Sequence, residues 1–507
     1  MSRTAKILSV IILVILVGAG LVFWKFWPKK NNSSPTTTAS KAGLFGTMLA
    51  FDINDAAMGT PGMLDAIRQK GWTEFRKDDS AYQNLLSNLE KLIQDHTKLV
   101  ETTGFSIDRE AVAGYFTWNV IEPQKGQFDW ELTDIYVKGA SNAGVKISAV
   151  IQPFAGWDQK DTEPEKAMAD FAYYDYKAGP PSDLAEYQNF LTKMVERYKD
   201  KVAVWEIDNE PENPGSGYQN NPEGYFDLVK ITSEMIKKAD PEAKVTNGGA
   251  MPIVGAPESD SYKAYWTKFF ALGGNQYIDY FNVHYNNERS PGATLDPATF
   301  QEELTFFNNF MEKNGGKKPL YLTEFGIYSG TPSDQLVGQL LQGQSPTANQ
   351  PVPPIQGGNQ GVQTPTKPSS TSQSFPNESQ DAQAALYFKD SVLASANGAN
   401  AVFVDLIGKE GDIIGSSALF NPEGQPRLFL ATLKAINQKL AGFSKSEKIA
   451  DGQYKFSVDG KTIYALWSGI LPSEISGKAK VTDLKGKEQT LDMSAIKLNP
   501  DQPVLIE

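Results

Sequence analysis

Apolar runs and amphipathic segments alternate along most of the chain. Between residues 44 and 442, runs rich in β-branched and aromatic residues are each followed by a stretch with apolar positions at helical spacing. Eight such pairs can be traced, and one of them is VAVWEIDNEP followed by EGYFDLVKITSEMIKKA. Strands that alternate with helices form a parallel sheet with right-handed crossovers, and eight repeats predict closure into a (β/α)8 TIM barrel. The alternative is an open doubly wound sheet, which more often carries a Gly-rich turn after its first strand.

Residues 331–380 interrupt this alternation. The segment is rich in Gln, Pro, Ser, Thr and Gly and has almost no large apolar residue. It cannot bury enough apolar surface to order itself, so we predict a low-complexity insertion in the barrel domain. Because it follows the seventh predicted strand, it leaves the barrel at the rim where active sites lie. It is either a tolerated surface insertion or a lid that contacts substrate.

After residue 442 the apolar pattern changes to a period of two. YKFSVDGKTIYALW predicts a hairpin that turns at Asp459-Gly460, and KAKVTDLKGKEQTL predicts another around Lys485-Gly486. Residues 443–507 are therefore expected to form a small antiparallel β domain packed on the barrel. Such a domain needs no role beyond folding, although ligand binding is an alternative.

The N-terminus has a different pattern again. Residues 7–24 form an uncharged apolar run, which is long enough to span a bilayer, within a predicted membrane anchor of residues 1–30. A cleaved signal peptide is the alternative, since residues 18–20 are small. Residues 31–43 are expected to form a flexible linker. We expect a single N-terminal helix in the lipid bilayer and an extracytoplasmic catalytic domain.

Composition narrows the chemistry. The formal charge of −12 and the pI near 5.0 argue against a nucleic-acid partner, which requires a basic face. The absence of Cys excludes disulfides and thiolate chemistry, and two histidines cannot build a three-His zinc site. The reactive groups must therefore be carboxylates, amides, hydroxyls, lysines or aromatic rings, and we expect neither an organic cofactor nor a metal.

Two glutamates stand out at the ends of predicted strands. The fourth strand ends in Asn209-Glu210-Pro211 and the seventh in Thr323-Glu324. The C-terminal ends of barrel strands meet at one rim, so both carboxylates are expected there. Paired carboxylates with separated pKa values cleave glycosidic bonds. A metal site built from carboxylates is the alternative that the residues alone leave open.

The other acidic residues around Glu210 have different expected positions. Glu206 and Asp208 should face the barrel interior, in a polar network below the site. Glu212 lies past the predicted strand and is expected to be solvated. Pro211 should hold the backbone of Glu210 in an extended conformation.

Three motifs carry a resemblance to a known group of proteins. VWEIDNEPENP, YLTEFGIYSG and GYFTWNVIEPQKGQFDW, which begins in the second predicted strand, resemble the clan A glycoside hydrolases, with families 39, 42 and 5 the nearest. The similarity covers most of the barrel. It implies a retaining mechanism with Glu210 as the acid/base and Glu324 as the nucleophile. It also implies that Asn209 hydrogen-bonds the sugar 2-hydroxyl.

The sequence departs from this family pattern in four strands, the second, third, sixth and eighth; the third ends in Gln152-Pro153-Phe154, where a His often stands. Many members carry an Arg near the start of strand two, whereas residues 113–115 in the predicted strand read Ala-Gly-Tyr. On the sixth predicted strand, the His-x-Tyr of several families appears as His284-Tyr285-Asn286. We expect these three residues to contact the sugar, with a packed structural role as the alternative for His284.

Aromatic residues near the rim could stack on sugar rings. Trp157, in a loop after the third predicted strand, and Tyr328, after the seventh, are the candidates for substrate binding. Trp118 and Trp205 lie within strand patterns, where core packing is expected. The eighth predicted strand ends in Val404-Asp405-Leu406 without the usual platform Trp.

The expected function is that of a retaining glycoside hydrolase acting on β-linked bonds of an oligo- or polysaccharide. An inactive barrel that binds glycans at the cell surface is one alternative, suggested by the missing Arg and Trp. A transglycosylase that uses the same two glutamates is the other.

Overall fold

The structure is a computed structural model that describes residues 43–49, 56–57, 59–110, 114–159, 179–213, 216–251, 260–286, 297–327, 377–407 and 417–507. The predicted anchor, all but the last residue of the linker and most of the insertion fall outside these ranges. Within them, no helix combines the length and apolar character needed to cross a bilayer.

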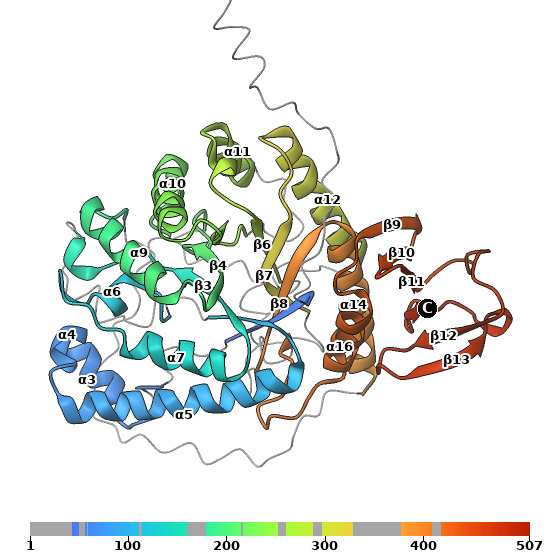
Figure 1. The fold of residues 1–507 in the computed structure, drawn as a ribbon, viewed down its shortest axis with the longest axis horizontal. Coiled ribbons are helices and arrows are strands. Elements are labelled where there is room, and N and C mark those ends of the chain that lie inside the picture. Colours follow the sequence, from blue (N-terminus) through green and yellow to red (C-terminus); the bar gives the residue numbers. More distant parts are fainter. Residues whose placement is uncertain are drawn as a thin grey trace, which may run out of the picture. The chain divides into compact units, whose positions relative to one another are not determined.

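Eight parallel strands form the central sheet (Figure 1). They are β1 (Phe45–Met48), β2 (Ile107–Arg109), β3 (Lys146–Ile151), β4 (Val202–Ile207), β5 (Lys244–Asn247), β6 (Phe281–Asn286), β7 (Leu320–Gly326) and β8 (Ala399–Asp405). The strand order is β5-β4-β3-β2-β1-β8-β7-β6. Two parallel bridges, Thr246 with Tyr280 and Ala250 with Val283, join the two ends of this order. The sheet therefore fits the predicted TIM barrel.

Helices surround the sheet (Figure 1). They are α3 (Met63–Lys70), α4 (Trp72–Phe75), α5 (Asp79–Thr103), α6 (Trp118–Ile121), α7 (Glu131–Asn142), α9 (Leu184–Tyr198), α10 (Pro222–Ala239), α11 (Asp260–Ala271), α12 (Pro297–Lys313), α14 (Asn377–Ala396) and α16 (Leu428–Leu440). Short 3-10 turns occur at η1 (Gly156–Asp158), η2 (Gly274–Gln276) and η4 (Met493–Ala495). Helix α14 begins inside the predicted insertion, so residues 377–380 belong to the barrel.

The second predicted strand is wrong. The sequence analysis placed it at residues 111–123, whereas β2 is Ile107–Arg109 and Trp118–Ile121 form helix α6. Gly104 explains the difference, because it ends α5 in the left-handed conformation (φ 71°) and the chain enters the sheet directly afterwards. All four residues of α6 are buried and three of them are apolar, so this turn of helix resembles a buried strand in sequence.

Trp118 and Trp205, which were expected to pack in the core, do so. Trp118 is fully buried, and its ring contacts those of Trp157 and Phe190. Trp205 on β4 is fully buried against Phe116.

The barrel interior is layered. Ile107, Val204, Tyr321, Ala401 and Phe403 form a separate apolar cluster contributed by β2, β4, β7 and β8. Side chains two residues further along a strand point to the same face. The next layer toward the C-terminal ends of β2 and β4 therefore receives Arg109 and Glu206. The apolar layer thus forms a floor beneath a polar layer.

The C-terminal domain is a six-stranded antiparallel sheet with strand order β13-β12-β14-β11-β10-β9. Its strands are β9 (Lys445–Ala450), β10 (Gln453–Val458), β11 (Lys461–Leu466), β12 (Lys478–Thr482), β13 (Glu488–Asp492) and β14 (Val504–Ile506). Both predicted hairpins are confirmed, and Asp459 and Gly460 turn with φ values of 48° and 79°.

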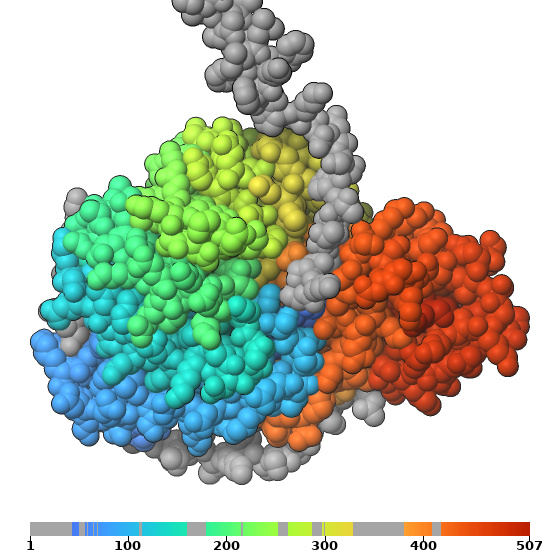
Figure 2. Space-filling model, in the orientation of Figure 1, coloured from blue at the N-terminus to red at the C-terminus, as the bar shows by residue number. Residues whose placement is uncertain are grey.

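This domain packs on the barrel helices. Thr432 of α16 donates to the carbonyl of Leu484 at 2.6 Å, and Phe388 of α14 contacts the ring of Trp467. In Figure 2 its surface adjoins that of α14 and α16. The structure thus agrees with a β domain packed on the barrel, while the exact boundary at residue 443 stays a prediction.

Candidate active site

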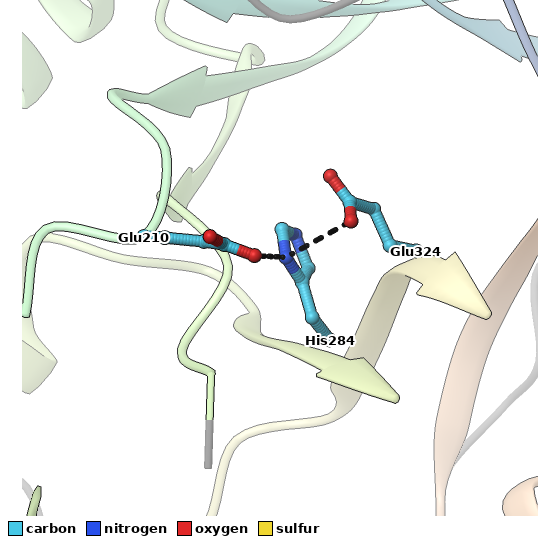
Figure 3. A group of neighbouring side chains, drawn as sticks. All are labelled: Glu210, His284 and Glu324. Carbon is cyan, nitrogen blue, oxygen red and sulfur yellow. Dashed lines mark hydrogen bonds and ion pairs between the residues drawn. The ribbon is translucent and has the colours of Figure 1, made fainter. Parts of the chain in front are cut away.

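The two predicted glutamates lie close together at the C-terminal ends of their strands. Glu210 follows the end of β4 by three residues, and Glu324 lies within β7. One carboxylate oxygen from each, together with a ring nitrogen of His284 from β6, lie within 4.8 Å of one another (Figure 3). Glu210 is buried, whereas the Glu324 side chain is 16% exposed. A reacting group that enters the barrel mouth therefore meets both carboxylates.

His284 connects the two glutamates. Its Nδ1 atom lies 2.8 Å from Oε1 of Glu210 and 3.5 Å from Oε2 of Glu324 (Figure 3). Its Nε2 atom lies 3.0 Å from the hydroxyl of Thr323. Burial lowers the pKa of His284, but the Glu324 carboxylate and the hydrogen bond with Glu210 outweigh burial and raise this pKa above its ordinary value. A raised pKa shifts the ring toward the imidazolium form, whose Nδ1–H can donate to the carboxylates.

Arg109 lies beneath the two glutamates. Its Nε and Nη2 atoms donate to the two carboxylate oxygens of Glu206, both at 3.0 Å. Nη2 also donates to Oδ1 of Asn209 at 3.0 Å, and Nη1 donates to Oε1 of Glu324 at 3.4 Å. Both Arg109 and Glu206 are fully buried. This paired guanidinium therefore brings a positive charge to Glu324 and fixes the orientation of Asn209.

Arg109 was missed by the sequence analysis, which found no arginine near the start of strand two. The error follows from the wrong position of that strand, since Arg109 is the last residue of the true β2. A signal was present in the sequence. Gly104 marks a helix end, and Phe105-Ser-Ile-Asp-Arg follows it immediately with apolar residues at alternate positions.

The inward-facing acids behave largely as expected. Glu206 is buried in the interior, where it accepts from Arg109 and, at 3.3 Å, from the hydroxyl of Thr323. Asp208 is also buried, and burial raises its pKa to about 7. A buried carboxylate needs a partner, and Arg109 supplies it for Glu206.

The backbone after β4 contradicts the extended conformation predicted for Glu210. Asp208 and Glu210 have positive φ values of 63° and 46°, which place both in the left-handed region. Asn213 holds the turn: its backbone N–H donates to the Glu210 carbonyl at 3.0 Å, and its side chain donates to Oε2 of Glu210. A residue other than glycine in this region costs roughly 1–2 kcal/mol. The preference imposed by Pro211 is therefore overridden by the turn.

Glu212 is not solvated, and the prediction that it would be is wrong. Its Oε1 accepts from the backbone N–H of Met251 at 2.7 Å and from Nε1 of Trp266 at 3.1 Å. Its other oxygen is buried without a hydrogen-bond partner among the described residues. Burial raises the pKa of Glu212 to about 7. The turn at Glu210 causes this, because it directs the chain back against the next β/α unit.

Two glycines leave room for this arrangement. A Cβ atom on Gly249 would lie 1.8 Å from Nε2 of His284, and one on Gly248 would lie 2.3 Å from the carbonyl oxygen of Asp208. Neither neighbour can move without disturbing the site. The Gly-Gly pair after β5 therefore fits the close approach of the His284 ring and the β4 turn.

For Tyr285, Asn286 and Tyr328, the structure gives less support for the predicted contact with sugar. The ring of Tyr285 packs on Phe300 of α12 and on Phe325, with centroids 4.3 Å and 5.9 Å away. The ring of Tyr285 is thus packed beside α12, and its contact with sugar stays a prediction. Asn286 ends β6, but its side chain is outside the description, as is the whole of Tyr328.

Trp157 lies in η1, half-buried. Its Nε1 donates to the carbonyl of Glu122 at 2.7 Å, and its ring meets that of Trp118 edge-on at 5.1 Å. These contacts hold the ring against the core, and its role in stacking on sugar stays a prediction.

Among the described residues, the side chains of Glu210, His284 and Glu324 lie close enough together to hold a metal ion. Glu210, His284 and Glu324 each offer one ligand atom. The guanidinium of Arg109, 3.4 Å from Glu324, opposes a cation there, and a metal ion would require His284 to be neutral. The charge of Arg109 therefore favours a catalytic pair of carboxylates over a metal site.

No protein-family model matches the sequence. Among solved structures, a family 39 glycoside hydrolase from Bacteroides cellulosilyticus is similar, with 16% identity over 82% of this chain and 78% of that chain and a TM-score of 0.53. A family 39 β-xylosidase from Caulobacter crescentus aligns at 15% identity over 82% of this chain and 92% of its own, with a TM-score of 0.50. The chain shares the fold of family 39 glycoside hydrolases. The predicted resemblance to the clan A glycoside hydrolases, of which family 39 was one of three families named, is thus confirmed for the fold.

A second structure from Caulobacter crescentus extends this likeness. It is a monomeric β-xylosidase, 13% identical, which covers 92% of this chain and 96% of its own length with a TM-score of 0.53. The match includes most of both chains. Identities this low speak for the fold of the family 39 enzymes, and the chemistry must be argued from the site.

Proposed function

We propose that this protein is a retaining glycoside hydrolase that cleaves β-linked bonds of an oligo- or polysaccharide. The observation that carries the proposal is the approach of the Glu210 and Glu324 carboxylates to within 4.8 Å at the mouth of the barrel. Retaining enzymes hold their two carboxyl groups about 5–5.5 Å apart, whereas inverting enzymes separate them by about 6.5–9.5 Å to admit a water. The short separation supports direct attack by one carboxylate.

In the proposed mechanism Glu324 is the nucleophile. Its oxygen bonds to the anomeric carbon as the bond to the leaving oxygen breaks, and Glu210 gives that oxygen its proton. Water then attacks the glycosyl-enzyme, Glu210 takes a proton from the water, and the bond to Glu324 breaks to restore the carboxylate. Glu210 thereby regains its proton, and no cofactor is needed.

The surroundings of the two carboxylates support this assignment. Arg109 contacts Glu324, and this neighbouring cation favours the ionised form that a nucleophile requires. Asn209 accepts from Arg109 through Oδ1, while its side-chain nitrogen has no hydrogen-bond partner among the described residues. That N–H group is available for the sugar 2-hydroxyl, which is the role that the resemblance implies for Asn209.

The substrate and the location are part of the proposal. Two of the similar structures are named β-xylosidases, so aryl β-xylosides are the first substrates to test. The apolar run at residues 7–24 supports a membrane anchor with the barrel on the extracytoplasmic side. Fractionation of cells, with and without these residues, tests that location.

The central experiment is a substrate panel with azide rescue. Aryl β-glycosides, β-glucans, xylans, mannans and galactans are offered to the protein with and without a chelator. In the Glu324→Ala variant, azide should attack the substrate directly and give the α-glycosyl azide. In Glu210→Ala, azide should attack the glycosyl-enzyme and give the β-glycosyl azide. Products of the opposite configuration would exchange the two roles, and turnover lost to the chelator would favour a metal site.

The two alternatives can be separated in the same panel. An inactive glycan-binding barrel predicts binding without turnover. One reason for this alternative was that strand two seemed to lack an Arg, and the structure shows that Arg109 lies in that strand. A transglycosylase predicts products longer than the substrate at low conversion, which chromatography detects.

A further inference from the structure

A cavity of about 590 Å³ lies on the helix side of the barrel, apart from the glutamates. Its wall comes from the segment after α4, the loop between α6 and α7, the first turn of α7 and the last turn of α9. These elements follow β1, β2 and β3, and none of the active-site residues lines the cavity. Small-molecule sites typically have volumes of about 300–1,000 Å³, so the cavity is large enough for a sugar unit.

Two aromatic rings form part of this wall. Phe128 and Trp130 are nearly parallel, with centroids 5.7 Å apart and an interplanar angle of 15°. The guanidinium of Arg197 lies 5.3 Å from the Trp130 ring, and the ammonium of Lys193 lies 4.1 Å from the Phe128 ring. Both rings are half-buried. Held in this way, they offer a fixed apolar surface to a flat ligand.

The side chain of Arg76 also forms part of the cavity wall. The Arg76 guanidinium lies 5.5 Å and 5.1 Å from the rings of Trp72 and Tyr82, and it also pairs with Asp129. Its Nε atom is buried and has no hydrogen-bond partner among the described residues. An N–H group buried without a partner is costly. Arg76 contributes its side chain, and with it a fixed positive charge, to the wall of the cavity.

Two side-chain amides complete the polar wall. Gln124 and Gln127 line the cavity on the loop between α6 and α7, and no hydrogen bond to another described residue occupies either side-chain amide. Each offers both a donor and an acceptor. A ligand with many hydroxyl groups can use both functions at once.

The charges of the wall balance. The cations Arg76, Lys77 and Arg197 are matched by three acids, which are Asp129, Glu131 and Asp134. A phosphate or nucleic-acid ligand would need an excess of positive charge. Alternating charged and amide groups beside aromatic rings suit a neutral ligand that is rich in hydroxyls.

We propose that this cavity is a second carbohydrate-binding site, which holds a neutral stretch of the polysaccharide while another stretch reaches the glutamates. The inference rests on the proposed function for the identity of the ligand. Trp130 is the N-cap residue of α7, in the segment that follows β2. One chain held at two places raises the effective concentration of substrate at the glutamates.

Affinity gel electrophoresis tests this inference without requiring turnover. The Glu324→Gln variant is run through gels that contain β-glucan, xylan, mannan or galactan, with a sulfated polysaccharide as the anionic control. At least one neutral polymer should retard it. Adding Gln127→Ala should weaken the retardation about threefold, and adding Trp130→Ala about tenfold or more. The matched control is Gln489→Ala, an exposed change on β13 that should leave retardation unaltered.

The outcomes separate this inference from the proposed function. Retardation that survives both cavity changes, or that occurs only with the sulfated polymer, would overturn the second site. Circular dichroism shows whether Trp130→Ala is folded, and exposed Gln127 provides the test if it is not. Turnover of aryl glycosides by the otherwise unaltered protein reports separately on the glutamates. Cavity-dependent binding without any turnover would support this site and contradict the hydrolase.

Discussion

The ends of β4 and β7 each present a glutamate, yet they do so in different ways. Glu324 lies within β7, just after a shift in the pairing register with β6, is partly exposed, and has Arg109 and His284 as neighbours at 3.4 Å and 3.5 Å. Glu210 follows its strand on left-handed backbone, is buried and is held by His284 at 2.8 Å and by Asn213. One carboxylate is placed by the sheet and the other by a strained turn.

This difference matches two chemical demands. A nucleophile must remain ionised and must not move, and a strand in a closed sheet provides a rigid support. An acid that later becomes a base must give a proton to the leaving oxygen and then take one from water. The contacts with His284 and Asn213 hold the Glu210 carboxylate in place for both steps. The two supports can be tested separately.

The largest effect is expected at the β7 end. Glu324→Gln removes the attacking oxygen and should lower kcat for aryl β-glycosides by roughly 10⁴- to 10⁶-fold. Steady-state kinetics measures this, and Glu447→Gln, an exposed change on β9, is the matched control. A residual rate above about one hundredth of normal would exclude Glu324 as the nucleophile.

At the β4 end the loss should depend on the leaving group. Glu210→Gln removes the proton donor, so kcat/KM should fall roughly 10²- to 10⁴-fold for alkyl glycosides and far less for dinitrophenyl glycosides, which leave without protonation. A series of aryl glycosides measures this dependence. An equal loss for all leaving groups would contradict the acid role.

Arg109 contacts both ends, so its removal should affect both. Arg109→Met leaves Glu206 buried without its cation, which should lower the free energy of unfolding by about 3–5 kcal/mol. Denaturant titration measures this loss. Arg197→Met is the control, because the Arg197–Asp134 pair is largely exposed and such pairs contribute about 0–1 kcal/mol. Equal losses in the two variants would show that the buried pair has no special weight.

The smallest effect concerns pH and the β4 end alone. Burial raises the pKa of Glu212 to about 7, against about 4.3 for an unfolded chain. The folded state therefore binds this proton more tightly, and its contribution to stability is full below about pH 4.3 and is lost as the pH rises to about 7. Glu212→Gln stays neutral, so its unfolding free energy should fall roughly 3 kcal/mol less over this interval.

Denaturant titrations at pH 4.5 and pH 7.5 measure the difference between the two proteins. Glu234→Gln on α10 is the control, since the Glu234 side chain is exposed. Parallel pH profiles for the unaltered protein and Glu212→Gln would mean that Glu212 keeps an ordinary pKa.

Much of this architecture could be predicted from the sequence. The repeated pairs of apolar run and helix gave the parallel sheet, because period and order are local properties of the chain. The same reasoning placed Glu210 and Glu324 at strand ends. The Asp459-Gly460 hairpin was predicted as well, since a two-residue turn depends on its own residues.

The failures occurred where neighbours in space decide the outcome. Arg109 was missed because β2 has only three residues and the more apolar stretch after it forms α6. Glu212 was expected in solvent because its partners, Met251 and Trp266, lie in another β/α unit. The left-handed backbone of Glu210 depends on the turn with Asn213, against the local preference set by Pro211.

The order of strands has a consequence for how the protein is made. In the sequence of hydrogen-bonded neighbours, β4 lies next to one end of the sheet and β7 next to the other, with Arg109 on β2 between them. Only the bridges between β5 and β6 bring Glu210 and Glu324 face to face. A nascent chain that has emerged through β6 therefore lacks half of the site, and no separate half-barrel contains it. Activity and completion of the barrel should appear together during synthesis, which protects the cell from a partly folded hydrolase.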